Sequence, residues 1–240
     1  MERRTALMSH MHIPDGVLPV WLWLSGLIIA LAGVALSLFM TRKTDLKKKV
    51  PLLGMMSAMM LVGMSLEIVS IAYHVNLSVI TGIILGPWLA FVAAFIVNLL
   101  LSLVGHGGVT TVGLNTIVIG SEGIMGYLLF SVFRKMARPG ISAAAATFIS
   151  LFMSTCLMLL IVYISNINLS LPSASEVRDI LETHPAETLA RAFKVNPGFN
   201  FRFFAIASLG LGPVGWVIEA LITGVAVRFI SKVKPEIIHH

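Results

Sequence analysis

The sequence predicts an all-α fold: an integral membrane bundle of about seven transmembrane helices. Hydrophobic residues make up 57% of the 240 residues and charged residues only 12%, and the mean hydropathy is +0.94. Soluble globular domains carry about 25% charged residues, so this chain has too few to cover its surface in water. The hydrophobic residues also fall into runs of the length that a membrane-spanning helix needs, about 20 residues.

Six hydrophobic runs account for the expected helices. They cover residues 18–40, 51–73, 77–104, 112–133, 141–164 and 203–230. The first run is longer than the hydrophobic region of a signal peptide and no small-residue cleavage site follows it, so we expect it to remain as a helix. The third run has 28 residues and contains Gly86-Pro87. Because proline breaks the interior of a helix, we expect two short helices that meet at this pair, which gives seven helices.

Basic residues predict the orientation of the bundle. They gather at 42–49, at 134–138 and at 228–234. Cytoplasmic loops of membrane proteins are enriched in Lys and Arg, and all three clusters share one side only if the third run enters and leaves the membrane as two short helices. We therefore expect the N-terminus outside and the C-terminus in the cytoplasm. The clusters also explain the net charge of +6 without a nucleic-acid partner.

Few residues of the chain offer chemistry. The sequence has no P-loop and no HExxH, GxSxG or GxGxxG motif, and its single cysteine, Cys156, excludes disulfides and sites built from several thiolates. Three acids, Glu67, Glu122 and Glu219, lie at membrane depth, where a carboxyl is costly. Each either contacts an ion or substrate, or hydrogen-bonds a neighbouring helix. We favour the second interpretation, because no Lys or Arg lies at that depth to pair with them.

Two histidines lie next to membrane runs at the expected outer surface. His12 precedes the first run and His74 precedes the third. Neutral imidazole is a common ligand of nickel, copper, zinc and iron, although two histidines alone do not define a metal site. His106 lies in a Gly-His-Gly-Gly segment whose glycines suit either an ordinary turn or a close approach of the backbone to a ligand.

The first run carries a stripe of small residues on one helical face. The stripe consists of Gly26, Ala30, Gly33 and Ser37. Small side chains let helices approach closely in a bilayer. The stripe therefore predicts either packing within the chain or docking to another membrane subunit.

Four segments, in this order, resemble one protein family. They are Met11-His12-Ile13-Pro14-Asp15-Gly16 before a membrane run, His74 followed by Leu85-Gly86-Pro87-Trp88, Gly105-His106-Gly107-Gly108 followed by Gly113-Leu114-Asn115, and Ile218-Glu219-Ala220-Leu221-Ile222-Thr223 followed by Lys234-Pro235. The chain resembles the CbiM/NikM family, the cobalt- or nickel-binding S components of energy-coupling-factor ABC transporters. The resemblance covers most of residues 11–236. It implies a single membrane domain there, a tail at 237–240, and a transport subunit rather than an enzyme.

The resemblance implies capture of extracellular Ni(II) or Co(II) as the transported substrate, without an organic cofactor. It implies that Met11 supplies its amine, His12 its amide nitrogen and Nδ1, and His74 the fourth donor. Four nitrogens in one plane suit Ni(II), although Co(II) accepts the same donors. By the same resemblance, Asp15, His106 and Asn115 orient the ligands through hydrogen bonds.

The family also implies partners. They are a transmembrane T component, two cytoplasmic ATPases and, in many systems, a small accessory subunit with two membrane helices. All would assemble in the prokaryotic cell membrane, with Gly26, Ala30, Gly33 and Ser37 as the expected docking face.

Two departures from the family pattern and two alternatives remain. Ile71-Ala72-Tyr73 precedes His74, where the family often has small residues. Residues 1–10 precede Met11 and block its amine while they are attached, so we expect translation to begin at Met11 or the extension to be removed. The chain could instead bind an organic vitamin, but only 8% of its residues are aromatic. It could also be an intramembrane metalloenzyme that uses His12 and His74 with Glu122 or Glu219, but those acids are expected to lie deeper than the histidines.

Overall fold

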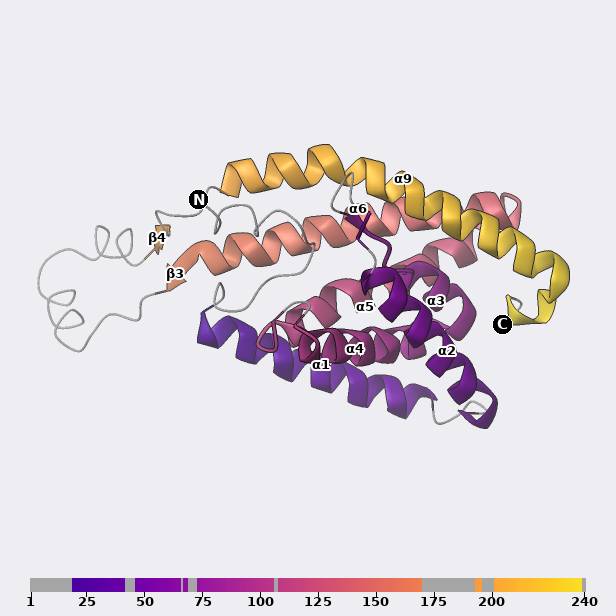
Figure 1. Cartoon of the computed structure of the whole chain (residues 1–240), viewed down its shortest axis with the longest axis horizontal. Coiled ribbons are helices and arrows are strands. Elements are labelled where there is room, and N and C mark those ends of the chain that lie inside the picture. The colour runs from indigo at the N-terminus through magenta and orange to yellow at the C-terminus, as the bar shows by residue number, and fades with distance from the viewer. Residues whose placement is uncertain are drawn as a thin grey trace, which may run out of the picture.

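The computed structural model describes residues 19–41, 46–65, 67–68, 73–105, 108–169, 193–195 and 201–238. These residues form seven α-helices (Figure 1). The helices are α1 (Val20–Thr41), α2 (Leu46–Ser65), α3 (Ser78–Leu85), α4 (Pro87–Leu103), α5 (Val112–Phe133), α6 (Pro139–Asn166) and α9 (Phe201–Val233). The expected all-helical bundle is confirmed, and the described residues contain the expected seven helices.

Short strands and a 3-10 turn complete the described part of the chain. β1 (Glu67–Ile68) pairs with β2 (Tyr73–His74), and β3 (Ile167–Leu169) pairs with β4 (Phe193–Val195), both antiparallel. The second hydrophobic run was expected to stay helical to residue 73, which is wrong, because α2 ends at Ser65 and β1 and β2 follow it.

Among the described residues, four helices are long and apolar enough to cross a membrane. They are α1, α5, the segment Pro139–Ser165 of α6 and the segment Ser208–Val233 of α9. α4 and the apolar part of α2 are shorter. α3 has eight residues, about 12 Å of helix, so it reaches only part of the way through a bilayer.

The third hydrophobic run breaks at Gly86-Pro87, as expected. Gly86 ends α3 with φ +86°, a backbone conformation that side chains with a Cβ rarely adopt. Pro87 then opens α4, where the missing N–H costs nothing because the first turn of a helix does not use it. The break separates the short α3 from the longer α4, and both helices pack within the bundle.

α3 lies at the centre of the bundle. All eight of its residues are buried, and it contacts α2, α4, α5, α6 and α9. Its closest neighbour is α5: a Cβ placed on Gly82 would lie 2.2 Å from the carbonyl oxygen of Gly123. On another side, Met56, Met60 and Met64 recur every four residues along α2 and are at most 1% exposed. They belong to the same hydrophobic cluster as the apolar side chains of α3 and α4.

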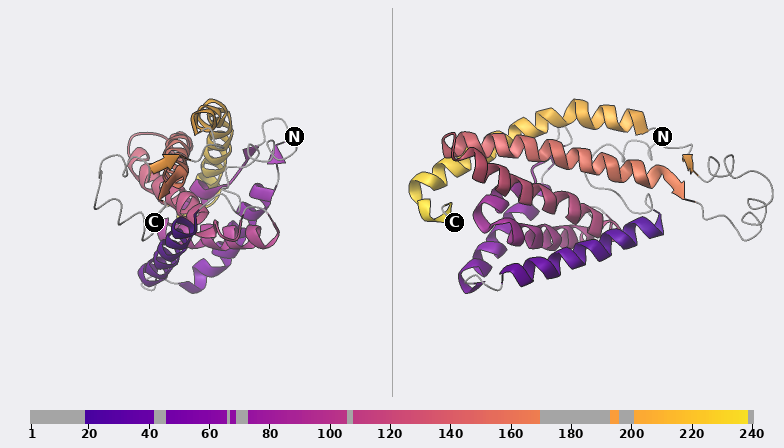
Figure 2. Two further views of the ribbon diagram at one scale, coloured as in Figure 1. Left: turned by 90° about the vertical axis from the view of Figure 1, so that its left-hand side faces the viewer. Right: turned by 180° about the vertical axis from the view of Figure 1, so that it is seen from behind.

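α6 and α9 form a long antiparallel pair on one side of the bundle (Figures 1 and 2). Near one end they touch through glycines, because a Cβ on Gly140 would lie 2.9 Å from the carbonyl oxygen of Gly224, and the reverse distance is also 2.9 Å. Further along, Trp216 of α9 meets the rings of Phe148 and Phe152 edge-on, at centroid distances of 5.8 and 5.7 Å.

The small-residue stripe of α1 packs inside the chain. A Cβ on Gly26 would lie 2.5 Å from Leu114 Cγ of α5, and one on Gly33 would lie 2.7 Å from the ring of Phe91 of α4. Ala30 and Ser37 are 0% and 2% exposed. Contacts within the chain therefore account for the small side chains, and the docking of a partner subunit to this face stays a prediction.

Basic helix ends and connections gather at one end of the bundle. The start of α2, which contains Lys47, Lys48 and Lys49, lies there with the connection from α5 to α6 and the end of α9, in both Figure 1 and Figure 2. The connection from α4 to α5 and the starts of α1 and α9 lie at the opposite end. This is the arrangement that the positive-inside interpretation requires.

The chain folds back after α9. A 3-10 turn, η1 (Pro235–Ile237), leads to Ile238, which is 5% exposed and belongs to the central hydrophobic cluster. Ile237 packs against the same cluster. The tail expected to begin at residue 237 therefore starts with two residues that contact the core.

Candidate functional site

The expected site residues divide into two groups. Met11, His12, Asp15 and His106 lie outside the described residues. His74 and Asn115 are described, so the site is built here from these two side chains and from the contacts that fix them.

His74 lies at the end of a short hairpin that leads into the centre of the bundle. In this hairpin, Glu67 of β1 is paired with His74 of β2, and Ile68 with Tyr73. The His74 side chain is partly buried. Three residues, 75–77, connect it to the first residue of α3, Ser78. The position of the imidazole therefore depends on how this three-residue turn is held.

The turn has an unusual backbone. Leu77 has φ 56° and ψ 19°, the left-handed conformation, which a leucine adopts at a cost of roughly 1–2 kcal/mol. Its carbonyl oxygen accepts the N–H of Thr81 at 3.1 Å and the Thr81 hydroxyl at 2.8 Å. Asn76 accepts the N–H of Ser78 on its side-chain oxygen at 2.8 Å, which closes a local side-chain turn.

A carboxyl from α9 binds the backbone of this turn. The N–H of Leu77 donates to Glu219 Oε1 at 3.0 Å, and the N–H of Asn76 donates to Glu219 Oε2 at 3.3 Å. Glu219 is 0% exposed. Both carboxyl oxygens are thus used on two consecutive backbone N–H groups, directly before the first turn of α3.

A second carboxyl, from α5, reaches the same place. The Ser78 hydroxyl donates to Glu122 Oε1, and the Ser154 hydroxyl of α6 donates to Glu122 Oε2 at 2.9 Å. Glu122 is 2% exposed. The two buried acids therefore hydrogen-bond neighbouring elements, which was the favoured interpretation of the sequence. Their meeting at one turn could not be predicted from the spacing of the two acids. A usable signal was the polar pair Asn76 and Ser78 at the start of an otherwise apolar run.

Asn115 fixes the start of α5. It is 5% exposed, and its Nδ2 donates to the Thr111 hydroxyl at 3.3 Å. That hydroxyl in turn donates to the carbonyl oxygen of Gly108 at 2.9 Å. Asn115 thus anchors the connection that contains His106. It precedes Glu122 by seven residues on the same helix, about 10 Å along the axis.

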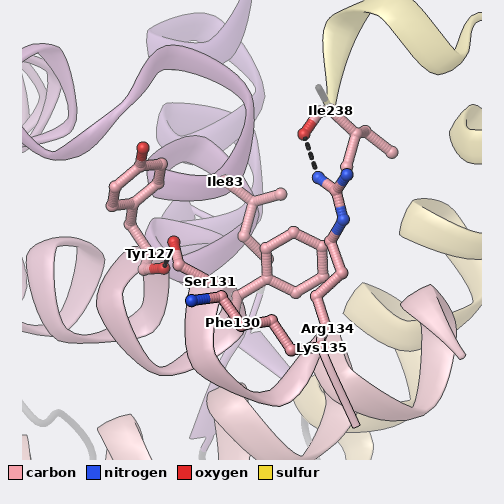
Figure 3. A pocket seen from close by; sticks show the side chains of 7 residues that line it. All are labelled: Ile83, Tyr127, Phe130, Ser131, Arg134, Lys135 and Ile238. Carbon is pink, nitrogen blue, oxygen red and sulfur yellow. Dashed lines mark hydrogen bonds between the residues drawn. The ribbon is translucent and has the colours of Figure 1, made fainter. Parts of the chain in front are cut away.

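A cavity of about 500 Å³ lies at the basic end of the bundle (Figure 3). It is lined by Ile83, Tyr127, Phe130, Ser131, Arg134, Lys135 and Ile238. The guanidinium of Arg134 closes one side by donating to the carbonyl oxygen of Ile238 at 2.8 Å, so this contact also holds the C-terminal segment. Two cationic side chains repel a divalent cation, and no lining residue is a histidine or an acid. The cavity therefore does not suit a metal ion.

Within the described ranges, no three side chains of His, Cys, Asp or Glu gather as a metal site of side-chain ligands would require. The site expected from the sequence does not need such a cluster, because two of its four nitrogens are backbone nitrogens: the Met11 amine and the His12 amide. The other two are imidazole nitrogens of His12 and His74. His74 is its one ligand in the described part of the chain.

Comparisons with known proteins agree with this fold. A family model described as the cobalt uptake substrate-specific transmembrane region matches residues 12–237. The cobalt transport protein CbiM of Clostridium tetani is 26% identical over 231 residues, which are 92% of this chain and 85% of that protein. A putative fused cobalt transport protein CbiMQ of Methanocorpusculum labreanum is 27% identical over 244 residues, but the chain spans only 36% of its length. A crystal structure described as a transition metal transporter has the same fold, with a TM-score of 0.75 at 19% identity, and covers 95% of this chain and 96% of that one.

Proposed function

Because the chain belongs to the CbiM family of cobalt uptake transmembrane proteins, we propose that it captures Ni(II) or Co(II) at the outer membrane surface. It does so as the S component of an energy-coupling-factor importer. Membership of this transport family makes the chain a multi-pass membrane transport protein and not an enzyme. The sequence left three hypotheses open. Membership of a cobalt uptake family favours a metal importer over a metalloenzyme or a vitamin-binding subunit.

The proposed site consists of four nitrogens. The Met11 amine, the His12 amide nitrogen and the His12 Nδ1 form adjoining chelate rings, and an imidazole nitrogen of His74 completes the plane. One observation supports this proposal. His74 is followed by a turn that is hydrogen-bonded by two buried carboxyls, Glu219 of α9 and Glu122 of α5. A ligand held in this way loses little conformational freedom when it binds a metal. Asp15, His106 and Asn115 are proposed to orient the ligands.

The proposed partners complete the importer. A transmembrane T component and two cytoplasmic ATPases supply the energy, and a small two-helix accessory subunit joins them in the membrane. The chain itself contains no nucleotide-binding motif, so ATP hydrolysis falls to the partners. The basic end of the bundle is proposed to face the cytoplasm, where those ATPases lie.

Calorimetric titration of two purified forms tests the metal site. One form begins at Met1 and the other at Met11, and each is titrated with Ni(II) and, separately, with Co(II). We expect one-to-one binding only by the Met11 form, because only that form has a free amine on Met11. His74→Ala should abolish it, whereas His184→Ala, in the polar stretch 166–200, should not.

Two results would contradict the proposal. Equal binding by both forms means that the amine is not a ligand. Full affinity in His74→Ala means that His74 is not one either. The comparison of Ni(II) with Co(II) in the Met11 form assigns the preferred metal.

A further inference from the structure

We propose that Glu219, with Glu122 in support, is a positioning residue for metal capture: it holds the turn 75–78 in the conformation that presents His74 to the metal. The proposal rests on the proposed role of His74 as a ligand. It extends that role to two acids, Glu122 in α5 and Glu219 in α9, which hydrogen-bond residues of the turn that follows His74.

The turn needs outside support. Leu77 is in the left-handed conformation, which a residue with a Cβ keeps only when surrounding contacts determine it. The N–H groups of Asn76 and Leu77 both precede the helix and have no acceptor within it. Asn76 and Leu77 are partly buried, so these two groups require a partner from elsewhere in the chain where water does not reach them.

Glu219 supplies both acceptors at once. Its two oxygens lie 3.3 and 3.0 Å from the backbone nitrogens of Asn76 and Leu77. The carboxyl also lies at the N-terminal end of α3, where the helix dipole favours negative charge. Because it accepts two consecutive backbone N–H groups, Glu219 restrains the φ and ψ angles of the residues that separate His74 from α3.

Glu122 connects this arrangement to two further helices. It accepts the Ser78 hydroxyl from α3 and the Ser154 hydroxyl from α6. The turn is therefore held between α5, α6 and α9. Loss of Glu122 leaves the hydrogen bond from the Ser78 N–H to Asn76 Oδ1 in place, so Glu122 should contribute less than Glu219.

The test uses Glu219→Gln in the form that begins at Met11. Glutamine has nearly the same shape, but its NH₂ group cannot accept a hydrogen bond, so one of the two backbone N–H groups loses its partner. We expect Ni(II) affinity to fall about tenfold, as when residues that orient metal ligands are changed. The loss should appear as faster metal dissociation.

The matched control is Thr223→Val, one turn further along α9. Thr223 is also 0% exposed, and its hydroxyl has no hydrogen-bond partner among the described residues. This variant changes a buried polar residue of the same helix without touching the turn, so its Ni(II) affinity and dissociation rate should equal those of the unmodified protein.

A spectroscopic signature separates positioning from a general loss of folded protein. The d–d absorption band of bound Ni(II) reports its four nitrogens. We expect Glu219→Gln to move this band to longer wavelength, because a poorly positioned His74 nitrogen gives a weaker ligand field. Partial unfolding would instead reduce the amount of bound nickel and leave both the band and the affinity of the remaining sites unchanged, which would overturn the proposal.

Amide hydrogen exchange of the metal-free protein tests the contact without any metal. The Asn76 and Leu77 amides should exchange faster in Glu219→Gln than in Thr223→Val or the unmodified protein. If Glu219→Gln does not fold, Ser78→Ala takes its place; it removes the bond to Glu122 and should lower Ni(II) affinity about threefold. Unchanged affinity in Ser78→Ala would then overturn the proposal.

The outcomes distinguish the two proposals. Full Ni(II) affinity in His74→Ala refutes the proposed metal site, and with it the role given to Glu219, even if the two amides exchange faster. Loss of binding in His74→Ala, with unchanged affinity, dissociation rate and absorption band in Glu219→Gln, refutes only the positioning role.

Discussion

Glu122 shows how a single buried carboxyl can link helices in a membrane. Its two oxygens meet hydroxyls from Ser78 and Ser154, on two different helices, and the residue is 2% exposed. We expect Glu122→Ala to lower the free energy of unfolding by about 2–4 kcal/mol, because it leaves a cavity and removes the acceptor of the Ser78 hydroxyl. Thermal unfolding of the purified protein, followed by tryptophan fluorescence, measures the effect.

Glu122→Gln is the control for that prediction. It keeps the volume of the side chain and one acceptor oxygen, so it should cost less than half as much. Equal losses in the two variants would mean that the hydrogen bonds to Glu122 do not determine its contribution.

The hydrogen-bond partners of single residues are what the sequence could not predict. The sequence identified Glu122 and Glu219 as costly acids that need partners, since burial of a carboxyl can be inferred from the hydrophobic run around it. It did not identify the partners. Glu219 and Leu77 are 142 positions apart, and only the packing of α9 against α3 brings them together.

At the scale of elements, the contact between α3 and α5 depends on glycine. A Cβ on Gly82 would lie 2.2 Å from the backbone oxygen of Gly123, and backbone cannot move aside as a flexible side chain can. We expect Gly82→Ala to push the two helices apart and to lower the free energy of unfolding by about 1–3 kcal/mol. Thermal unfolding in detergent measures it.

Gly54→Ala in α2 is the matched substitution. No atom lies within 4 Å of a Cβ placed on Gly54, so alanine should stabilise the helix by up to about 1 kcal/mol. If both substitutions changed the stability in the same direction, the effect at Gly82 would not come from its contact with Gly123.

The elements differ in how far the sequence could predict them. The break at Gly86-Pro87 was predictable, because glycine and proline act locally on the backbone. The end of α2 at Ser65 was not, because hydrophobic residues continue to Tyr73 and the hairpin that replaces the helix depends on contacts outside the run. The shortness of α3 was predictable as well, because the third run starts at residue 77 and breaks at Gly86-Pro87.

For the whole molecule, the fold class followed from two properties of the sequence: too few charged residues for a soluble surface, and hydrophobic runs of the length of a membrane-spanning helix. The orientation in the membrane is a prediction that labelling can test. After Cys156→Ser removes the single native thiol, Val109→Cys places a cysteine in the connection from α4 to α5 and Met136→Cys places one in the connection from α5 to α6. Val109 and Met136 are 60% and 84% exposed.

With the N-terminus outside, an impermeant thiol reagent should label the Val109→Cys variant in intact cells. It should label the Met136→Cys variant only after the membrane is opened. The reverse pattern would place the basic end of the bundle outside and contradict the proposed direction of metal capture. Equal labelling of both variants in opened cells is the control for reactivity.

The hydrogen bonds from Glu219 to the turn before α3 also bear on biosynthesis. They join the last membrane helix, α9, to a segment that leaves the ribosome 142 residues earlier. Until α9 enters the membrane, the N–H groups of Asn76 and Leu77 lack these acceptors, and α3 is too short to be inserted as a spanning helix by itself. In a nascent chain that stops before α9, the turn that follows His74 lacks both of these acceptors, so we expect its conformation to be set only when α9 enters the membrane.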